Sequence, residues 1–214
     1  MSGPSSAPSS RRQRAVESFR SAAECIGPIV PGLSLFTITR GQWSMLDAVQ
    51  HVIAEIGPCE VSLWTWCVAD YEVECMSALM ANKAIVGARL VIDRSAEVRS
   101  APTIEGWRRR FGVEAVRVCR NHSKVARVWN DDVRVLIRGS MNLNYNPRFE
   151  QADISEGGEE FSLVERIEDE LPILPARCSN SEAESASKLS LAFEASELAM
   201  FSGVKPWSIG PRTK

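Results

Sequence analysis

Hydrophobic residues recur along this chain with periods that alternate between those of helices and strands. The apolar residues of 45–56 fall on one face at helical spacing. Ser44 and Asp47 form a capping box at the start of this segment, and Gly57 is typical of a helix end. The run 61–66 is rich in β-branched and aromatic residues, which predicts a buried strand directly after the helix.

The same alternation continues to residue 138. The elements predicted after the first strand are, in order, a helix from about 70, a strand at 89–93, a short helix at 104–111, and strands at 115–119, 124–129 and 133–138. Asn130, Asp131 and Asp132 supply turn chemistry for a hairpin between the last two strands. This order predicts an α/β fold in which helices flank a layered mixed β-sheet.

The two ends of the chain differ in composition from its middle. Residues 1–14 are dominated by Ser, Pro, Gly, Ala and Arg, which predicts a disordered tail. Residues 15–40 are interpreted as an N-terminal extension, and the folded domain is placed at 41–172. Residues 173–214 are predicted to form an acidic, helical C-terminal extension.

Composition also limits the class of protein. No stretch approaches the roughly 20 apolar residues of a membrane-spanning helix, and the N-terminus has no apolar run of the signal-peptide kind. The 6 cysteines are scattered, without the short spacings of zinc sites or disulfide scaffolds. The protein is therefore expected to be soluble and cytoplasmic, with reduced thiols.

The net charge of -2 hides an uneven distribution of charged residues. Residues 81–150 carry 14 Lys and Arg against 7 Asp and Glu, whereas residues 151–214 carry 6 against 12. A basic block favours contact with phosphate, although a solvated Arg-rich surface has the same composition. The segment with the strongest chemical signal lies within this basic block.

That segment, 122–150, combines a histidine and a lysine with several hydrogen-bonding side chains. His122 and Lys124 are two residues apart at the start of a predicted strand, so both side chains are expected on the same side. The predicted hairpin returns a glycine, Ser140 and Asn142 to the same end of the sheet. A tetrahedral phosphate anion needs a set of this kind: a histidine, a permanent cation and hydrogen-bonding side chains.

The pattern H-x-K followed by G-S-x-N, with Glu150 downstream, resembles the HKD motif of the phospholipase D superfamily. The likeness covers residues 41–154 and is strongest to the small members with a single motif, which are bacterial nucleases. It implies a phospholipase D-like half-domain to which the C-terminal helices are an addition. No metal and no other cofactor is implied.

The resemblance also implies a role for each residue of the motif. His122 of one subunit is expected to attack phosphorus and form a phosphohistidine, while His122 of the partner subunit protonates the leaving oxygen. Lys124 and Asn142 are expected to hold the non-bridging oxygens, with Ser140 supporting them. Glu150 is expected to orient the histidine.

The number of histidines predicts how the protein assembles. The implied reaction needs two histidines, and the chain contains only His51 and His122. His51 shares the polar line of Asp47 and Glu55 on its predicted helix, which favours a surface histidine over a catalytic one. An isologous homodimer that brings two copies of the motif together is therefore expected.

One position departs from the motif. The family usually has an aspartate five residues after the lysine, where this chain has Trp129. Asp131 and Asp132, in a predicted turn that is longer than usual, are the candidates to replace that aspartate.

Three functions are compatible with these residues. The leading hypothesis is a dimeric nuclease acting on DNA or RNA, because arginines surround the motif. The arginines expected to contact nucleic-acid phosphates are Arg120, Arg127, Arg138 and Arg148. One alternative is a nucleic-acid-binding protein of the same fold with weak or no catalysis, which Trp129 favours. The other is a lipid phosphodiesterase or phosphatidyltransferase, although no membrane anchor is evident.

Overall fold

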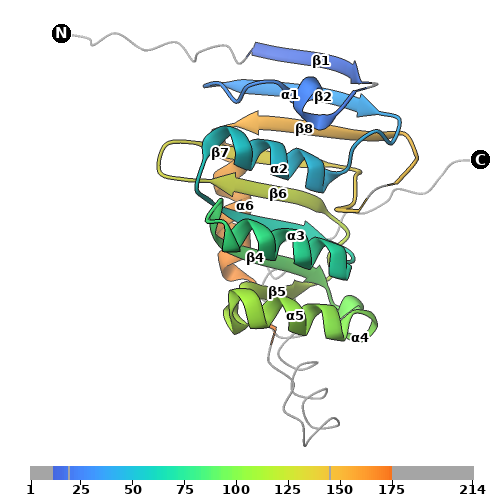
Figure 1. Cartoon of the computed structure of the whole chain (residues 1–214), viewed down its shortest axis with the longest axis vertical. Helices are drawn as coiled ribbons and strands as arrows, with labels where there is room; N and C mark the ends of the chain where they lie inside the picture. Colours follow the sequence, from blue (N-terminus) through green and yellow to red (C-terminus); the bar gives the residue numbers. More distant parts are fainter. Residues whose placement is uncertain (1–11, 19, 145, 175–214) are drawn as a thin grey trace, which may run out of the picture. The chain divides into compact units, whose positions relative to one another are not determined.

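Eight strands form one mixed sheet in the structure, a computed structural model that describes residues 12–18, 20–144 and 146–174 (Figure 1). The strand order across the sheet is β1-β2-β8-β7-β6-β3-β4-β5. The strands are β1 (Arg12–Ser18), β2 (Leu33–Thr39), β3 (Cys59–Thr65), β4 (Ile85–Asp93), β5 (Val116–Cys119), β6 (Lys124–Trp129), β7 (Arg134–Gly139) and β8 (Glu150–Glu156).

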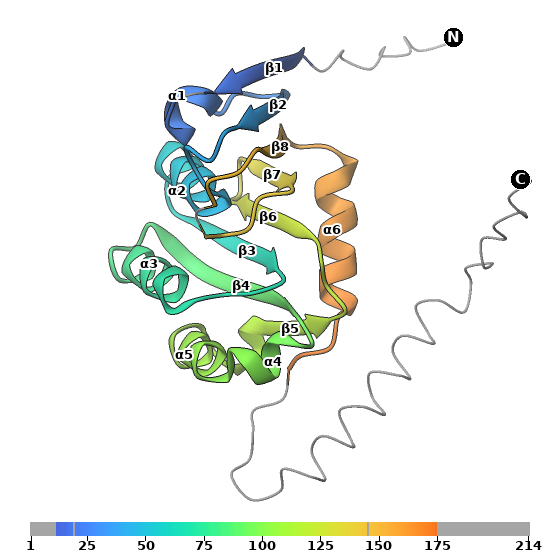
Figure 2. The same ribbon diagram turned by 90° about the vertical axis from the view of Figure 1, so that its right-hand side faces the viewer.

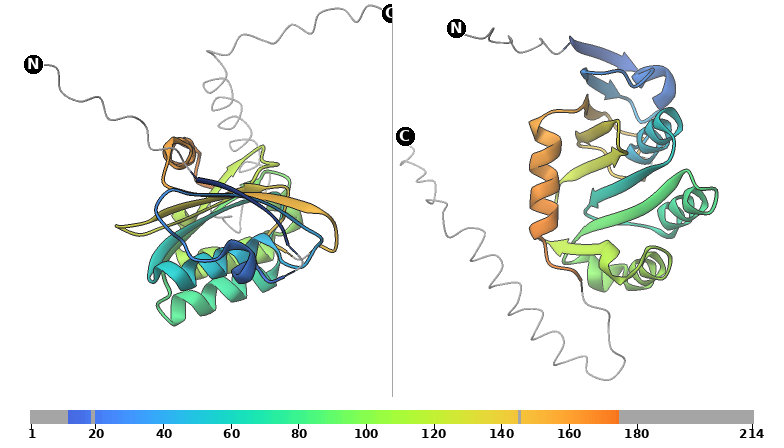
Figure 3. Two further views of the ribbon diagram at one scale, coloured as in Figure 1. Left: turned by 90° about the horizontal axis from the view of Figure 1, so that it is seen from above. Right: turned by 90° about the vertical axis from the view of Figure 1, so that its left-hand side faces the viewer.

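Helices cover both faces of this sheet. They are α1 (Ala22–Ile26), α2 (Met45–Ile56), α3 (Asp70–Ala81), α4 (Ala96–Arg99), α5 (Ala101–Phe111) and α6 (Glu159–Glu170). Figure 2 shows α1, α2, α3 and α5 on one face and α6 on the opposite face. The view from above in Figure 3 shows the twisted sheet as the layer between them. The predicted class, an α/β fold with helices flanking a layered mixed sheet, is confirmed.

The connections between strands follow from their directions. β3, β4 and β5 are parallel neighbours and are joined through helices, because parallel strands cannot be joined by a tight turn. β6 and β7 pair in antiparallel fashion and form the predicted hairpin. In its turn, Asn130 N donates to Val133 O at 3.0 Å, and Asn130 Oδ1 accepts from the backbone N of Asp132 and Val133.

The limits of α2 are set by local side chains. Asp47 Oδ2 accepts from Ser44 N at 2.7 Å and Ser44 Oγ accepts from Asp47 N at 3.3 Å, which completes the predicted capping box. Gly57 ends the helix at a φ of 78°, a left-handed conformation that favours glycine. Val49 and Val52 are fully buried beneath the helix. The helix predicted from the sequence is confirmed at both ends.

The core lies on both sides of the central strands. Val61 and Leu63 of β3 are fully buried. On the face that α6 covers, Trp64, Val91 and Leu171 pack into one buried cluster. Successive residues of a strand point to opposite faces, so a strand covered on both faces is mostly apolar instead of alternating. This is why β3 and β4 are recognisable as buried strands in the sequence.

The N-terminal segment belongs to the same sheet. Residues 12–39, interpreted from the sequence as the end of a tail and an extension, instead form β1, α1 and β2. β2 pairs with β8, from Thr39 opposite Glu150 to Ser34 opposite Ser155. β8 was not predicted, because its sequence is rich in polar residues and one of its two strand partners, β2, lies far away in the chain.

Other predictions concern residues at the limits of the structure. The tail was predicted at 1–14, and its residues 1–11 lie outside the described residues. The same is true of almost all of the predicted extension at 173–214. Within the described ranges, no helix has the length and apolar character needed to cross a lipid bilayer.

Candidate active site

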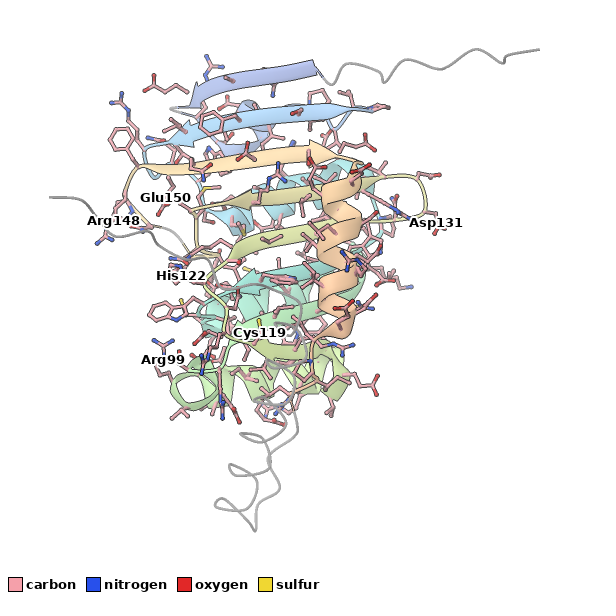
Figure 4. All side chains as sticks on the ribbon, turned by 180° about the vertical axis from the view of Figure 1, so that it is seen from behind. Arg99, Cys119, His122, Asp131, Arg148 and Glu150 are labelled. Atoms are coloured by element: carbon pink, nitrogen blue, oxygen red, sulfur yellow. The ribbon has the colours of Figure 1, made fainter. Side chains whose placement is uncertain are left out.

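The motif residues gather at one edge of the sheet. β5 ends shortly before His122, and β6 begins at Lys124. Strand pairing places Lys124 opposite Gly139 at the end of β7, and Gly139 opposite Ala152 near the start of β8. Figure 4 shows His122 and Glu150 at this same edge. The neighbouring strands β6, β7 and β8 and the loop that follows β5 therefore bring the motif to one edge of the sheet.

A buried asparagine fixes the loop that carries the histidine. Asn121 is 3% exposed, and its Nδ2 donates to Thr65 O at 3.2 Å and to Val91 O at 3.4 Å. Its backbone N donates to Asp93 Oδ2 at 2.9 Å, and its Oδ1 accepts from Ser123 N at 2.8 Å. The loop is thus tied to the ends of β3 and β4. Sequence analysis missed this residue, because only the fold reveals its partners.

The histidine and the lysine of the motif are in direct contact. Lys124 Nζ lies 3.2 Å from His122 Nδ1 and 3.4 Å from His122 Nε2, and it donates to His122 O at 2.8 Å. His122 is exposed and Lys124 is half-buried. The expected placement of both side chains on one side is therefore observed. An imidazole beside a fixed ammonium group can present both a nucleophile and a positive charge to a phosphate.

Ser140 and Glu150 form a second pair at this edge. Ser140 Oγ donates to Glu150 Oε2 and accepts from Gln151 N at 3.0 Å. Asn146 Nδ2 donates to Glu150 Oε1 at 3.1 Å. The Glu150 carboxylate is thus bonded to Ser140 and Asn146, and the bonds of His122 are those with Lys124. A role for Glu150 in orienting a histidine stays a prediction.

Asn142 has an unused polar atom. Its Oδ1 is buried, with no hydrogen-bond partner among the described residues. Its backbone O accepts from Met45 N at 3.3 Å, and Leu143 O accepts from Leu46 N at 3.4 Å, so this segment is tied to the first turn of α2. A buried amide without a partner is unfavourable unless a ligand supplies one, and rotation of the amide exchanges donor and acceptor. Asn142 is therefore suited to bind a ligand oxygen.

Gly139 allows β7 and β8 to approach closely beside Ser140. A Cβ atom at this position would overlap Gln151 O and lie 3.0 Å from Ala152 Cα. Both of those atoms belong to the backbone, so they could not move aside without breaking the strand pairing. The glycine of the motif is therefore required by packing, whatever the site binds.

Trp129 and the turn aspartates lie away from the site. Trp129 ends β6, about 17 Å along the strand from Lys124 at the usual rise per residue. Its ring meets Phe161 of α6 edge-on, with centroids 6.0 Å apart. Asp131 and Asp132 lie in the following turn, and Figure 4 shows Asp131 on the side opposite His122. Neither aspartate can therefore replace a group at the site. Trp129 stands too far along the strand to take the place of a residue that touches the site.

The prediction that Arg127 contacts nucleic acid is wrong. Its side chain is fully buried and lies between Glu165 Oε1 at 3.1 Å and Glu168 Oε1 at 3.2 Å. Its guanidinium also stacks over Trp129 and Phe161, at 4.5 and 5.0 Å from the ring centroids. A buried and paired guanidinium cannot reach a phosphate in solvent, so Arg127 has a structural role beneath α6.

The other three arginines predicted to contact nucleic acid are not fully buried. Arg120 and Arg148 are exposed, and Arg138 is half-buried. Figure 4 shows Arg148 at the same edge as His122. Elsewhere in the basic block, Arg117 Nη1 donates to Leu171 O at 2.9 Å and Arg108 Nη2 donates to Leu174 O at 2.5 Å. Part of the basic block therefore holds the C-terminal end of the described chain, and part faces solvent.

Cys119 lies close to the site but is not a nucleophile. Burial, with a smaller contribution from the charge of Asp93, raises the pKa of Cys119 to about 11. The thiol therefore stays protonated near neutral pH, and the reactive species of cysteine is the thiolate.

Asp93 links the loop of the site to the short helix α4. Burial by itself raises its pKa, but hydrogen bonds from Ser95 and Asn121 and the charge of Arg99 outweigh burial, so the pKa lies below its ordinary value. A lowered folded-state pKa means that the ionised form stabilises the fold. This contribution is complete above the unfolded-state pKa and is lost as the pH falls through the folded-state pKa.

We expect Asp93→Asn to lower the thermal unfolding temperature at pH 7 and to have a smaller effect at acidic pH, once the pH has fallen through the lowered pKa of Asp93. Thermal melts followed by circular dichroism at both pH values test this. Asp131→Asn, in the exposed turn, is the matched control and should change little at either pH. An equal loss at both pH values for Asp93→Asn would contradict a charge-dependent role.

The two histidines differ in their surroundings. His51 is half-buried on α2, and its Nε2 lies 2.8 Å from Gly27 O. His122 is exposed at the edge of the sheet. In residues 12–174, without 19 and 145, no group of three or more His, Cys, Asp or Glu side chains is placed to hold a metal ion.

The fold and the site together define an α/β protein with a partly exposed set of histidine, lysine, serine and asparagine at one edge of a mixed sheet. No protein-family model matches the chain, and no curated protein matches it. Among solved structures, it is similar to the crystal structure of polyphosphate kinase from Porphyromonas gingivalis, with a TM-score of 0.37 and 14% identity. The likeness covers 76% of this chain and 28% of that chain. At so low a TM-score, it defines neither family nor activity.

Proposed function

We propose that this protein is a metal-independent phosphodiesterase of the phospholipase D type, and specifically a nuclease whose site is shared by two subunits. The observation that carries the proposal is the contact of an exposed imidazole with a lysine ammonium group, 3.2 Å from His122 Nδ1 to Lys124 Nζ. Ser140 and Asn142 lie on the loop that leaves the neighbouring strand. The sequence pattern that resembles the HKD motif is the second support.

In the proposed reaction, His122 attacks phosphorus through a ring nitrogen, and the bond from phosphorus to the leaving oxygen breaks. His122 of the partner subunit gives its proton to that oxygen. Water then attacks the phosphohistidine, the partner's His122 takes a proton from this water, and the first histidine is released. Lys124 and Asn142 stabilise the negative charge on the non-bridging oxygens, with Ser140 supporting them.

Two features support a site shared by two subunits. His51 is half-buried on α2 and its Nε2 lies 2.8 Å from Gly27 O, which argues against His51 as the second histidine. His122 and Ser140 are also exposed at an open edge of one subunit. An isologous dimer would supply the second imidazole and would shield the reacting phosphate from water.

Nucleic acid is the proposed substrate because of the exposed charge near the site. Arg148 lies at the same edge as His122 in Figure 4. Arg120 is two residues before His122 in the chain, and Arg138 precedes Gly139 on β7. Phosphates of a nucleic-acid chain on either side of the bond to be cleaved would meet these cations. Contacts of this kind carry no sequence information, so we expect little base specificity.

The proposal predicts that the purified full chain nicks supercoiled plasmid DNA in buffer that contains EDTA. Conversion of supercoiled to open-circular DNA on an agarose gel is the measurement. The matched control is Asp131→Asn, which changes an exposed residue at the far side of the sheet and should retain the activity. A gel shift without nicking would contradict catalysis and indicate a binding protein. Absence of both, with single-stranded DNA as well as with plasmid, would contradict nucleic acid as the substrate.

A further inference from the structure

Trp66 is unusually exposed for a tryptophan at the end of a central strand. It directly follows β3, in which every residue except Glu60 is buried. Trp66 itself is 39% exposed. Because a large aromatic side chain gains free energy on burial, a tryptophan left in solvent beside a functional edge is suited to bind a ligand.

Arg99 holds this ring in place. Its Cζ lies 4.2 Å from the centroid of the Trp66 ring, within the range of a cation-π contact. The guanidinium is itself fixed, because its Nε donates to Ser95 O at 3.3 Å and its Nη2 donates to Ser95 Oγ at 3.0 Å. Ser95 Oγ in turn donates to Asp93, which also accepts from the backbone of Asn121. A connected set of hydrogen bonds therefore links Arg99 to the loop of the candidate site.

The indole and the candidate nucleophile are neighbours. The ring centroids of Trp66 and His122 are 6.2 Å apart, and the ring planes are tilted by 55°. Figure 4 shows Arg99 and His122 at the same edge of the sheet. A ligand group that stacks on Trp66 would therefore be attached directly to the phosphate held at His122.

We infer that Trp66 and Arg99 form a base-binding subsite beside His122, and that the substrate is single-stranded nucleic acid. This inference rests on the proposed phosphodiesterase function and names its substrate class. Bases of a single strand can stack on aromatic rings and on the planes of guanidinium groups. Bases of a duplex are already stacked on one another and must be unpaired before an indole can reach them.

The positive charge next to the indole favours a nucleic-acid base over a lipid headgroup as the ligand. A choline headgroup would bind an indole through its own positive charge. Here the ring already carries the guanidinium of Arg99, and a second cation would be repelled. A planar, neutral base meets no such repulsion and can stack on either group.

The inference is tested by binding of fluorescein-labelled oligonucleotides of about 12 nucleotides to the full chain, in a His122→Asn background that cannot cleave them. The probes are oligothymidylate, an abasic oligomer with the same number of phosphates, and a duplex of the same length. We expect Trp66→Ala to weaken binding of oligothymidylate by roughly 5- to 100-fold, because stacking on one aromatic ring is lost. Binding of the abasic oligomer should be unchanged.

Two further variants separate stacking from misfolding. Trp66→Phe keeps an aromatic face and should retain most of the affinity. Phe36→Ala removes a ring of similar exposure, 42%, on β2, which β8 and β7 separate from β6, and it should have no effect. Equal losses for oligothymidylate and the abasic oligomer, or tighter binding of the duplex, would overturn the inference. So would binding to phosphatidylcholine vesicles that depends on Trp66.

The outcome also distinguishes the inference from the function on which it rests. Plasmid nicking that depends on His122 but does not change in Trp66→Ala, together with unchanged oligothymidylate binding, overturns the base-binding subsite and leaves the phosphodiesterase in place. Base-dependent binding that requires Trp66, in a protein that cleaves neither plasmid nor single-stranded DNA, supports the subsite and overturns the catalytic proposal.

Discussion

Replacing His122 with alanine is expected to lower the rate of phosphodiester hydrolysis by roughly 10,000-fold or more, because the substitution removes both the nucleophile and the proton donor of the proposed reaction. His122 is exposed, so its loss should leave the fold and the unfolding temperature nearly unchanged. Initial rates of nicking by wild type and variant, with circular dichroism as the check on folding, measure this effect. Substantial residual activity would show that another group attacks phosphorus.

Mixed dimers extend this prediction to the shared site. Each proposed site takes one His122 from each subunit, so a dimer with one substituted chain has no complete site. After subunits have exchanged with about a ninefold excess of His122→Ala chains, wild-type activity should fall to about one tenth. The same mixture assayed before exchange is the control. Activity that does not change after exchange, or a fully active monomer in sedimentation, would contradict a site built from two chains.

Replacing Arg127 with methionine is expected to lower the free energy of unfolding by about 3 to 5 kcal/mol, because it leaves buried Glu168 without its main charge partner. Glu168 is fully buried and also accepts from Ser62 Oγ at 2.5 Å and from Trp64 Nε1 at 2.9 Å. Arg89 Nη1, 3.3 Å away at the edge of this network, compensates only in part. Urea denaturation of the full chain measures the loss.

Arg148→Met is the matched control for Arg127→Met. Arg148 is exposed near the candidate site, so its loss should change stability by no more than about 0.5 kcal/mol and should weaken binding of nucleic acid. Adding Glu168→Gln to Arg127→Met should recover part of the lost stability, because it removes the buried negative charge. If Arg127→Met were as stable as wild type but bound nucleic acid weakly, the structural role of Arg127 would be contradicted.

The elements predicted correctly share a local physical cause. The limits of α2 depend on Ser44, Asp47 and Gly57, whose hydrogen bonds and backbone angles involve neighbours only a few residues away. The hairpin between β6 and β7 depends in the same way on Asn130. β2 and β8 were missed in part because they pair with each other across most of the chain, a contact that no local pattern announces.

The residues of the candidate site also differ in whether the sequence or only the tertiary structure reveals them. The sequence by itself identified the histidine, lysine, serine and asparagine of the motif, because the predicted hairpin returns the chain beside Lys124, and the pairing of Lys124 with Gly139 agrees with that hairpin. Only the tertiary structure decided that Arg127 is buried beneath α6 while Arg148 faces solvent, since the two residues have the same chemistry and differ in what covers them. It alone placed Trp66 beside His122, because their contact depends on the order of strands in the sheet and not on any local signal.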